Sequence, residues 1–138
     1  MDDDETSTIP KFVLEKMILP GCAKVPIDGD GFSIKVVNAI SPFKIVRYTN
    51  DEYKEKISFK LDGRELNHDN FYIKYQGVIA PISDLSKLHG VIVNIDDTVD
   101  LIYKGEEIEA GKHEIDIYSK STNPLRIKFE INFHEGFY

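Results

Sequence analysis

The feature that most constrains the fold is a strict alternation of apolar and polar side chains near the end of the chain. Apolar residues stand at Leu125, Ile127, Phe129, Ile131 and Phe133, and a polar residue stands between each pair. Successive side chains of a β-strand point to opposite faces, so this pattern predicts a strand with one buried face. Shorter alternations of the same kind cover residues 32–37, 57–62, 71–76, 91–95, 99–103 and 112–117.

Strands of this number and spacing are typical of two packed sheets. We therefore predict an all-β fold, an antiparallel β-sandwich of the jelly-roll or immunoglobulin-like kind, with about seven to nine strands. Tight reversals are expected at Asp62-Gly63, Lys104-Gly105 and Ala110-Gly111, because these residues tolerate a positive φ. Pro42 and Pro81 are expected at strand starts or bulges, since proline cannot donate a hydrogen bond to a sheet.

The sequence predicts at most one short helix. Residues 10–17 fit either a short helix with Pro10 near its first turn or an edge strand. Residues 83–88 fit a single helical turn with Ser83 as its N-cap.

Length and composition indicate one domain. The chain has 138 residues, of which 41% are hydrophobic and 30% charged, so it is neither disordered throughout nor membrane-spanning. We expect an acidic, flexible tail over residues 1–8 and a single sandwich domain over residues 9–138. The net charge of −7 disfavours a nucleic-acid partner, because such binding depends on cationic contacts.

A cytoplasmic location is expected from the cysteine content and from the first residues. Cys22 is the only cysteine, so no intramolecular disulfide can form and a reducing compartment is the default. Residues 1–8 are acidic and polar, whereas a secretory signal begins with basic residues and continues with an apolar stretch.

Nothing in the sequence marks a catalytic or cofactor-binding residue. The cluster of Asp96, Asp97 and Asp100 could supply an acid and a base, but it also fits a solvated loop, which we favour. Residues 28–31 (Asp-Gly-Asp-Gly) resemble the start of a calcium loop, but Phe32 stands where another oxygen ligand is required, which favours a β-turn. Cys22 has no neighbouring histidine or basic cluster, so a buried, inert thiol is expected.

The histidines form no local metal-binding motif. His68, His89, His113 and His134 make no HxH, HxxxH or HExxH pattern, so we expect no metal site. Ligands from distant strands could still meet in the folded protein, and this alternative stays open. His113 follows a glycine turn, which favours a capping contact at the rim of the sheet.

Three aromatic residues near the end of the chain are the candidate interface residues. Phe133, Phe137 and Tyr138 carry large apolar rings on a segment that is otherwise expected to fray. Such rings either fold back onto the core or dock into another subunit, and we predict a partner interface here.

The order of several segments resembles a known family. The segments are residues 16–21 (KMILPG), Gly31-Phe32 with a strand ending at Val37-Asn38, Ser41-Pro42, residues 57–65 (ISFKLDGRE) and residues 109–117 (EAGKHEIDI). Together they are similar to the small β-subunit of C-glycoside deglycosidases and its relatives. The resemblance implies a β-sandwich that assembles with a larger, metal-dependent TIM-barrel subunit, which carries the catalytic residues and cleaves a carbon–carbon bond between a sugar and an aromatic aglycone.

Three functional hypotheses follow. The leading one is a non-catalytic accessory subunit of a sugar-processing complex, with the larger TIM-barrel protein as its partner. The alternative is a stand-alone module that binds a small ligand or a carbohydrate on the sandwich. A third is an enzyme whose histidines bind a metal across strands. A homo-oligomer is a further possible arrangement.

Overall fold

The computed structural model describes residues 7–8, 10–26, 29–45, 57–120 and 125–136. It is mostly β, with 49% of residues in strands and 9% helical, which confirms the predicted all-β, sandwich-like fold. The strands are β1 (Ser7–Thr8), β2 (Ala23–Val25), β3 (Phe32–Val37), β4 (Phe43–Lys44), β5 (Ile57–Leu61), β6 (Arg64–Glu65), β7 (Phe71–Tyr75), β8 (Val78–Pro81), β9 (Ile92–Val93), β10 (Thr98–Tyr103), β11 (Gly111–Ser119) and β12 (Leu125–Glu135). The helices are α1 (Lys11–Met17) and the 3-10 turn η2 (His68–Asn70).

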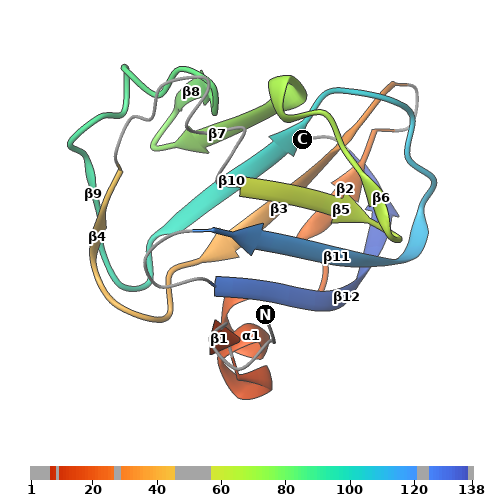
Figure 1. Ribbon diagram of the computed structural model, residues 1–138, viewed down its shortest axis with the longest axis horizontal. Helices are drawn as coiled ribbons and strands as arrows, with labels where there is room; N and C mark the ends of the chain where they lie inside the picture. The colour runs from red at the N-terminus through yellow and green to blue at the C-terminus, as the bar shows by residue number, and fades with distance from the viewer. Residues whose placement is uncertain (1–6, 9, 27–28, 46–56, 121–124, 137–138) are drawn as a thin grey trace.

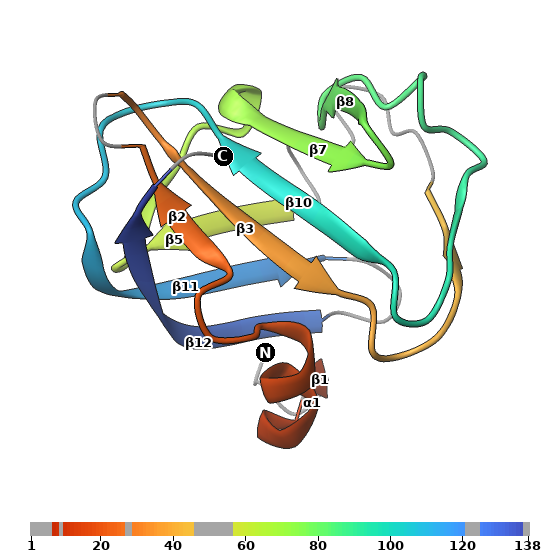
Figure 2. The same cartoon turned by 180° about the vertical axis from the view of Figure 1, so that it is seen from behind.

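Two layers face each other and share one strand (Figure 1). One layer has the order β6-β5-β11-β12, and the other continues from β12 through β2-β3-β10-β7-β8. The strand β12 belongs to both layers, because most of it pairs with β11 while His134 and Glu135 near its end pair with β2. The view from behind places β2, β3, β10 and β7 in front of β5 and β11 (Figure 2).

Most strand pairs in the described part of the chain are antiparallel, as predicted. The short pairs β1–β12 and β12–β2 are parallel. Ser7 and Thr8 pair with Leu125 and Arg126, so the sheet begins inside the segment that the sequence assigned to the tail. Both parallel pairs involve β12, whose length lets it meet segments that come from far along the chain.

Aromatic rings from both layers form the main core. Phe59 of β5 stacks on Phe71 of β7 with ring centroids 4.2 Å apart, so this pair joins the two layers directly. Phe32 lies 4.9 Å from Phe133 and 5.2 Å from Tyr103, measured between centroids. Each of these side chains is at most 7% exposed. Full burial of such a side chain contributes about 1.5–3 kcal/mol relative to an exposed one.

A second, smaller core lies beside the first. It contains Ile45, Tyr75, Ala80, Leu85, Leu88 and Val93. The strands β4 and β9 form a separate two-stranded sheet at this end of the molecule (Figure 1). The main layer and this small sheet therefore enclose apolar side chains between them, next to the candidate site.

The helix and turn predictions have mixed outcomes. The helical alternative for residues 10–17 is confirmed, with Pro10 at the N-cap of α1. Residues 83–88 form turns and no helix, and the Asp84 carboxylate accepts the backbone N–H of Ser86, so the prediction of Ser83 as an N-cap is wrong. An Asp side chain competes with helix formation by bonding to the backbone two residues on.

Two hairpins have turns with two consecutive positive φ angles. Asp62 and Gly63 (φ 53° and 82°) join β5 to β6 as expected. Gln76 and Gly77 (φ 50° and 80°) join β7 to β8, a hairpin that the sequence analysis missed. Pro81 ends β8, which is the edge strand of its layer, so its missing N–H costs no ladder hydrogen bond there.

Candidate functional site: an apolar pocket at the end of the sandwich

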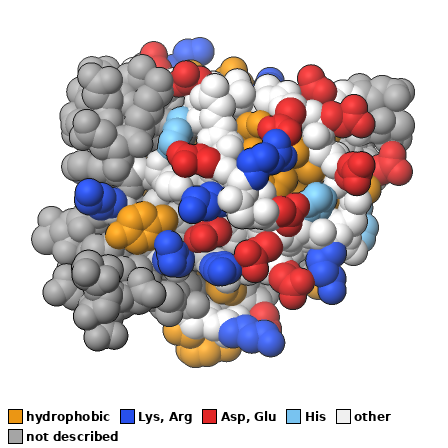
Figure 3. Space-filling model, turned by 45° about the vertical axis from the view of Figure 1, so that its right-hand side comes forward, with side chains coloured by type: hydrophobic (Ala, Val, Ile, Leu, Met, Phe, Trp, Pro, Cys, Tyr) orange, Lys and Arg blue, Asp and Glu red, His pale blue; other side chains and the backbone are white. Residues whose placement is uncertain are grey.

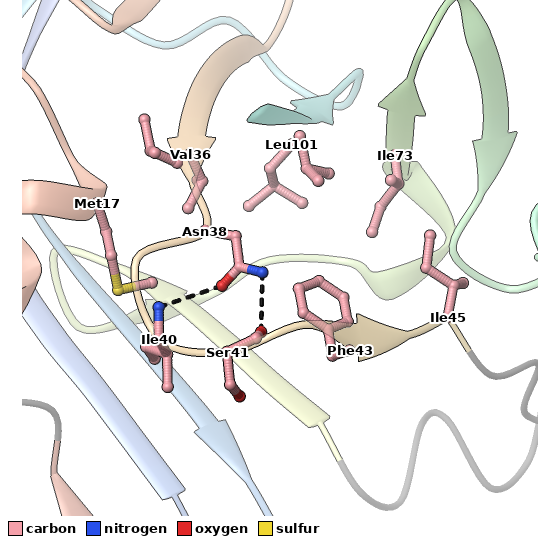
Figure 4. Close-up of a pocket in the computed structure, with 11 residues that line it drawn as sticks. Met17, Val36, Asn38, Ile40, Ser41, Phe43, Ile45, Ile73 and Leu101 are labelled. Atoms are coloured by element: carbon pink, nitrogen blue, oxygen red, sulfur yellow. Dashed lines mark hydrogen bonds between the residues drawn. The ribbon is translucent and has the colours of Figure 1, made fainter. Parts of the chain in front are cut away.

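A cavity of about 430 Å³ lies between the inner face of the β3–β10–β7 layer and the segment that leads from β3 into β4. Its wall consists of Met17, Val36, Val37, Asn38, Ile40, Ser41, Phe43, Ile45, Ile73, Val99 and Leu101. Val36, Leu101 and Ile73 project from the strands toward Phe43 and Ile45 (Figure 4). The lining residues come from segments that are far apart in the sequence.

The pairing of the strands determines which residues form one side of the pocket. Val36 of β3 pairs with Val99 of β10, and Leu101 of β10 pairs with Ile73 of β7. Because alternate residues of a strand share a face, Val36 points to the same side as the buried Ile34. The pocket floor is therefore the continuation of the core face beyond the region that the other layer covers.

Asn38 holds the opposite wall in place. Its side chain is buried, and its amide nitrogen lies 2.9 Å from the carbonyl oxygen of Ser41 and 3.2 Å from those of Val93 and Asn94. Its side-chain oxygen accepts the backbone N–H of Ile40 at 3.3 Å. The polar atoms of the side chain are thus used by the protein itself, as a buried amide requires.

The backbone of Asn38 ties the same two segments together. Its N–H donates to the carbonyl oxygen of Asp97, and its own carbonyl accepts the N–H of Asp96, both at 2.8 Å. Asp96 adopts a positive φ of 73°, a conformation that Asp tolerates better than most residues. These two hydrogen bonds therefore attach the loop 94–97 to the segment that forms the pocket wall.

The pocket presents apolar surface to a ligand. Ser41 and Asn38 are the polar residues among those that line it, and none of its lining residues carries a charge. Ile40 and Phe43 line it while remaining 57% and 47% exposed. Exposed apolar side chains beside a concave apolar wall are typical of a site that takes a neutral, hydrocarbon-rich group.

The aspartate cluster does not converge on a reaction centre. Asp97 accepts the Tyr75 hydroxyl at 2.6 Å and the backbone N–H of Asn94 at 3.0 Å. The Tyr75 hydroxyl and that N–H hold the pKa of Asp97 below its usual value, while the Asp97 carboxylate raises the pKa of Tyr75. Asp100 lies instead on the outer face of the sheet, 4.0 Å from Lys35.

Two of the four histidines, His68 and His113, make structural contacts. His113 has its Nδ1 2.6 Å from the carboxylate of Asp62 and its Nε2 2.7 Å from the carbonyl oxygen of Glu109, which matches the expected contact at the rim. The His68 ring contacts the carbonyl oxygen of Ile57. Among the residues that the structure describes, no group of three or more His, Cys, Asp or Glu side chains could hold a metal ion.

Phe133 packs into the core, which is the first of the two alternatives predicted for the aromatic residues near the chain end. Its side chain is 1% exposed and packs against Phe32 and His113 inside the sandwich. A ring in this position is not available to dock into another subunit, so we no longer assign Phe133 to a partner interface. Phe137 and Tyr138 lie outside the described residues.

The calcium-like pattern and Cys22 remain to be placed, and of these residues Gly31 has a clear structural role. Gly31 has a φ of +87°, and a Cβ atom there would lie 1.7 Å from the carbonyl oxygen of Tyr103, so this turn requires glycine. Asp28, the first residue of the calcium-like pattern, lies outside the described residues. Cys22 is half-buried, and burial raises the pKa of its thiol.

Comparisons with known proteins add no family. No protein-family model matches the chain, and no curated protein matches it either. None of the helices in the described ranges is long and apolar enough to cross a membrane.

The sequence analysis missed the pocket residues. Asn38 and Ile40 lie between the end of a predicted strand and Pro42, where the residue pattern predicts no binding site. The exposed apolar residues Ile40 and Phe43 on either side of Ser41-Pro42 were the available signal, since an irregular segment usually carries polar residues. Their position beside the core face depends on the pairing of β3 with β10, which sequence alone did not give.

Proposed function

We propose that this protein is a binding protein that takes a neutral, apolar small molecule in the pocket between β3, β10, β7 and the segment 38–45. The observation that carries the proposal is the cavity of about 430 Å³ whose lining residues include no charged side chain. This volume falls within the range typical of small-ligand sites. The proposal refines the stand-alone binding module that the sequence suggested as an alternative.

The chemistry of the wall favours an apolar ligand over a carbohydrate. A sugar loses hydrogen bonds to water on binding and needs polar partners in return, whereas the Asn38 amide is already bonded to backbone groups. Burying about 200 Å² of apolar ligand surface contributes roughly 5 kcal/mol before the costs of association. Ligands with a ring system or a branched hydrocarbon chain fit these requirements.

The test is a fluorescence titration with Nile red, a neutral apolar dye. We expect saturable binding to the natural protein and at least a fivefold higher Kd for the double variant Ile40→Ser/Phe43→Ser. The matched control is Ile79→Ser/Ile92→Ser, which removes two similarly exposed side chains that do not line the pocket. Val99→Phe, which fills the cavity, is expected to weaken binding as well.

Two outcomes contradict this proposal. One is the absence of saturable dye binding to a protein whose urea midpoint shows that it is folded. The other is an equal loss of dye affinity in the pocket variant and in the control variant, which would indicate general surface binding.

A second proposal follows from the family resemblance: a non-catalytic, cytoplasmic accessory subunit of a sugar-processing complex with a larger, metal-dependent TIM-barrel partner. It is supported by apolar side chains that are 39–52% exposed outside the pocket, at Val78, Ile79, Ile92 and Ile95. Apolar side chains of this kind contribute to protein interfaces. In this second proposal the protein takes part in carbohydrate metabolism, whereas in the first it does not need to.

The accessory-subunit proposal is tested by affinity purification from native cells. We expect a TIM-barrel protein in the purified complex, and less of it with Ile92→Ser/Ile95→Ser than with the control Phe12→Ser, whose side chain is exposed on α1. Recovery of the chain alone contradicts the proposal. Elution at twice the monomer mass would then indicate a homo-oligomer instead.

A further inference from the structure

The outer face of the β2–β3–β10–β7 layer carries lysine residues on neighbouring strands. Lys35 alternates with the buried Ile34 on β3, so its side chain points away from the core. Asp100 of β10 pairs with Lys35 on one side and with Lys74 of β7 on the other. Lys24 lies on β2, the next strand beyond β3. This is the face turned toward the viewer in Figure 2.

These side chains surround a hollow of about 220 Å³ on the opposite side of the sheet from the apolar pocket. Lys24, Lys35 and Lys74 line it together with Ser33 and Asp100. Asp100 is the one acidic residue among those that line the hollow, so the hollow has two more cationic than anionic side chains. This local positive charge contrasts with the net charge of −7 of the whole protein.

Ion pairing leaves most of this positive charge uncompensated. The Lys35 ammonium is 4.0 Å from the nearer oxygen of Asp100, at the outer limit of an ion pair. Within the described ranges, Lys24 and Lys74 form no ion pair with a carboxylate. Ammonium groups that converge on a hollow without matching carboxylates raise the local potential for an anion.

On the outer face of the β6-β5-β11-β12 layer, by contrast, cationic side chains are paired with carboxylates. There Arg126 lies 3.4 Å from Asp116, and Lys128 lies 3.8 Å from Glu114. Figure 3 shows Lys and Arg side chains interspersed with Asp and Glu on this side of the molecule. The excess of lysine around the hollow is therefore a local property and not a general one of the sheet surfaces.

We infer that the hollow between β2, β3, β10 and β7 binds a small molecule through a phosphate group. A phosphate dianion can accept hydrogen bonds from two ammonium groups at once, and lysine is a common phosphate ligand. Ser33, which also lines the hollow, can add a hydroxyl donor. At about 220 Å³ the hollow is smaller than a typical site for a whole small molecule, so it would take the phosphate group while the rest of the ligand lies outside it. This inference is independent of the apolar pocket, which lies on the other face.

The test is a titration of ¹⁵N-labelled protein with inorganic phosphate at constant ionic strength, followed by amide chemical shifts. We expect saturable shifts at Ser33, Lys35 and Asp100. The variant Lys24→Gln/Lys35→Gln/Lys74→Gln should raise the Kd at least tenfold. The control Lys11→Gln/Lys87→Gln/Lys112→Gln removes the same charge outside the hollow and should change the Kd less than twofold.

A variant that is expected to strengthen phosphate binding distinguishes a specific effect from a loss of binding through misfolding. Asp100→Asn removes the one carboxylate from the hollow and should lower the Kd for phosphate at least threefold. Succinate in place of phosphate tests whether a dicarboxylate is bound as well, and we expect weaker binding. Shifts that do not saturate, equal effects of the two lysine triples, or no gain with Asp100→Asn would each overturn the inference. Ile40→Ser/Phe43→Ser should leave phosphate binding unchanged, which separates this test from that of the apolar pocket.

Discussion

The side-chain amide of Asn38, at the end of β3, lies 3.2 Å from the carbonyl oxygen of Val93 in β9, 55 residues farther along the chain. This contact joins the main sheet to the small sheet and fixes the pocket wall. Asn38→Ala leaves the carbonyl oxygens of Ser41, Val93 and Asn94 without this donor. Each buried group left unsatisfied costs about 1–3 kcal/mol.

We therefore expect Asn38→Ala to lower the free energy of unfolding by about 2–4 kcal/mol, since water replaces part of the lost bonding. Urea denaturation followed by circular dichroism measures this change. The control is Asn132→Ala, at an exposed position of β12, which should change stability by less than about 0.5 kcal/mol. Similar losses for both variants would show that Asn38 does not brace the pocket wall.

Gly31 and Gly63 both have a positive φ but differ in the space around them. A Cβ atom at Gly31 would overlap the carbonyl oxygen of Tyr103, whereas one at Gly63 meets nothing within 4 Å. We expect Gly63→Ala to cost about 1 kcal/mol for its backbone conformation alone, and Gly31→Ala to cost at least about 3 kcal/mol. Chemical denaturation of the two variants compares them, and equal costs would contradict the close approach at Gly31.

Phe133 is predicted to contribute to stability and not to partner binding. Because its ring is buried among Phe32 and His113, Phe133→Ala should lower the free energy of unfolding by about 3–5 kcal/mol. Phe133→Leu keeps most of the apolar volume and should cost less. If the Phe133→Ala protein has an unchanged urea midpoint, the ring is not part of the packed core, and this prediction is contradicted.

Asp62 gives the fold a pH dependence at low pH. The backbone N–H of Glu114 and the neighbouring His113 lower the pKa of the Asp62 carboxyl in the folded protein. A group whose pKa is lower in the folded state stabilises the protein above its unfolded pKa of about 3.9, and this contribution disappears as the pH falls through the folded value. The difference in urea midpoint between the natural protein and Asp62→Asn should therefore be largest near neutral pH.

The same difference should shrink as the pH falls below about 4, because the unfolded state becomes protonated at Asp62 first and the folded state follows at lower pH. Urea midpoints at several pH values between neutral and acidic conditions follow the trend. Glu130→Gln, on the exposed face of β12, serves as the control for general acid effects. A difference that grows as the pH falls would contradict the predicted direction.

The strands with strong alternation were predictable because each one carries its own signal. Residues 32–37 and 125–133 lie in β3 and β12, and the Asp62-Gly63 hairpin forms where expected. In these cases one face of a strand is buried and the other exposed, so the period of two is written in the residues themselves. The short strands β4 and β6 have only two residues each and carry no such period.

The pocket and the basic hollow could not be derived in the same way. The pairing of Asp100 with both Lys35 and Lys74 requires β10 to lie between β3 and β7, and sequence alternation does not state the order of strands. Two of the three acceptors of the Asn38 amide are 55 and 56 residues away, so its role depends on the closure of the small sheet. Phe133 is predicted as a partner-interface residue because a segment near the chain end is expected to fray, whereas β12 pairs on both sides close to this residue.

By itself, the sequence determined that this chain forms two layers of half-buried strands, since local alternation and turn residues act within a few positions of each other. Which side chains meet was decided by the tertiary structure alone. The order of the strands brings Val36, Leu101 and Ile73 together on one face of the sheet, and Lys35 and Lys74 together on the other. Contacts of this kind depend on distances between segments that are far apart along the chain, and no local property of the residues encodes those distances.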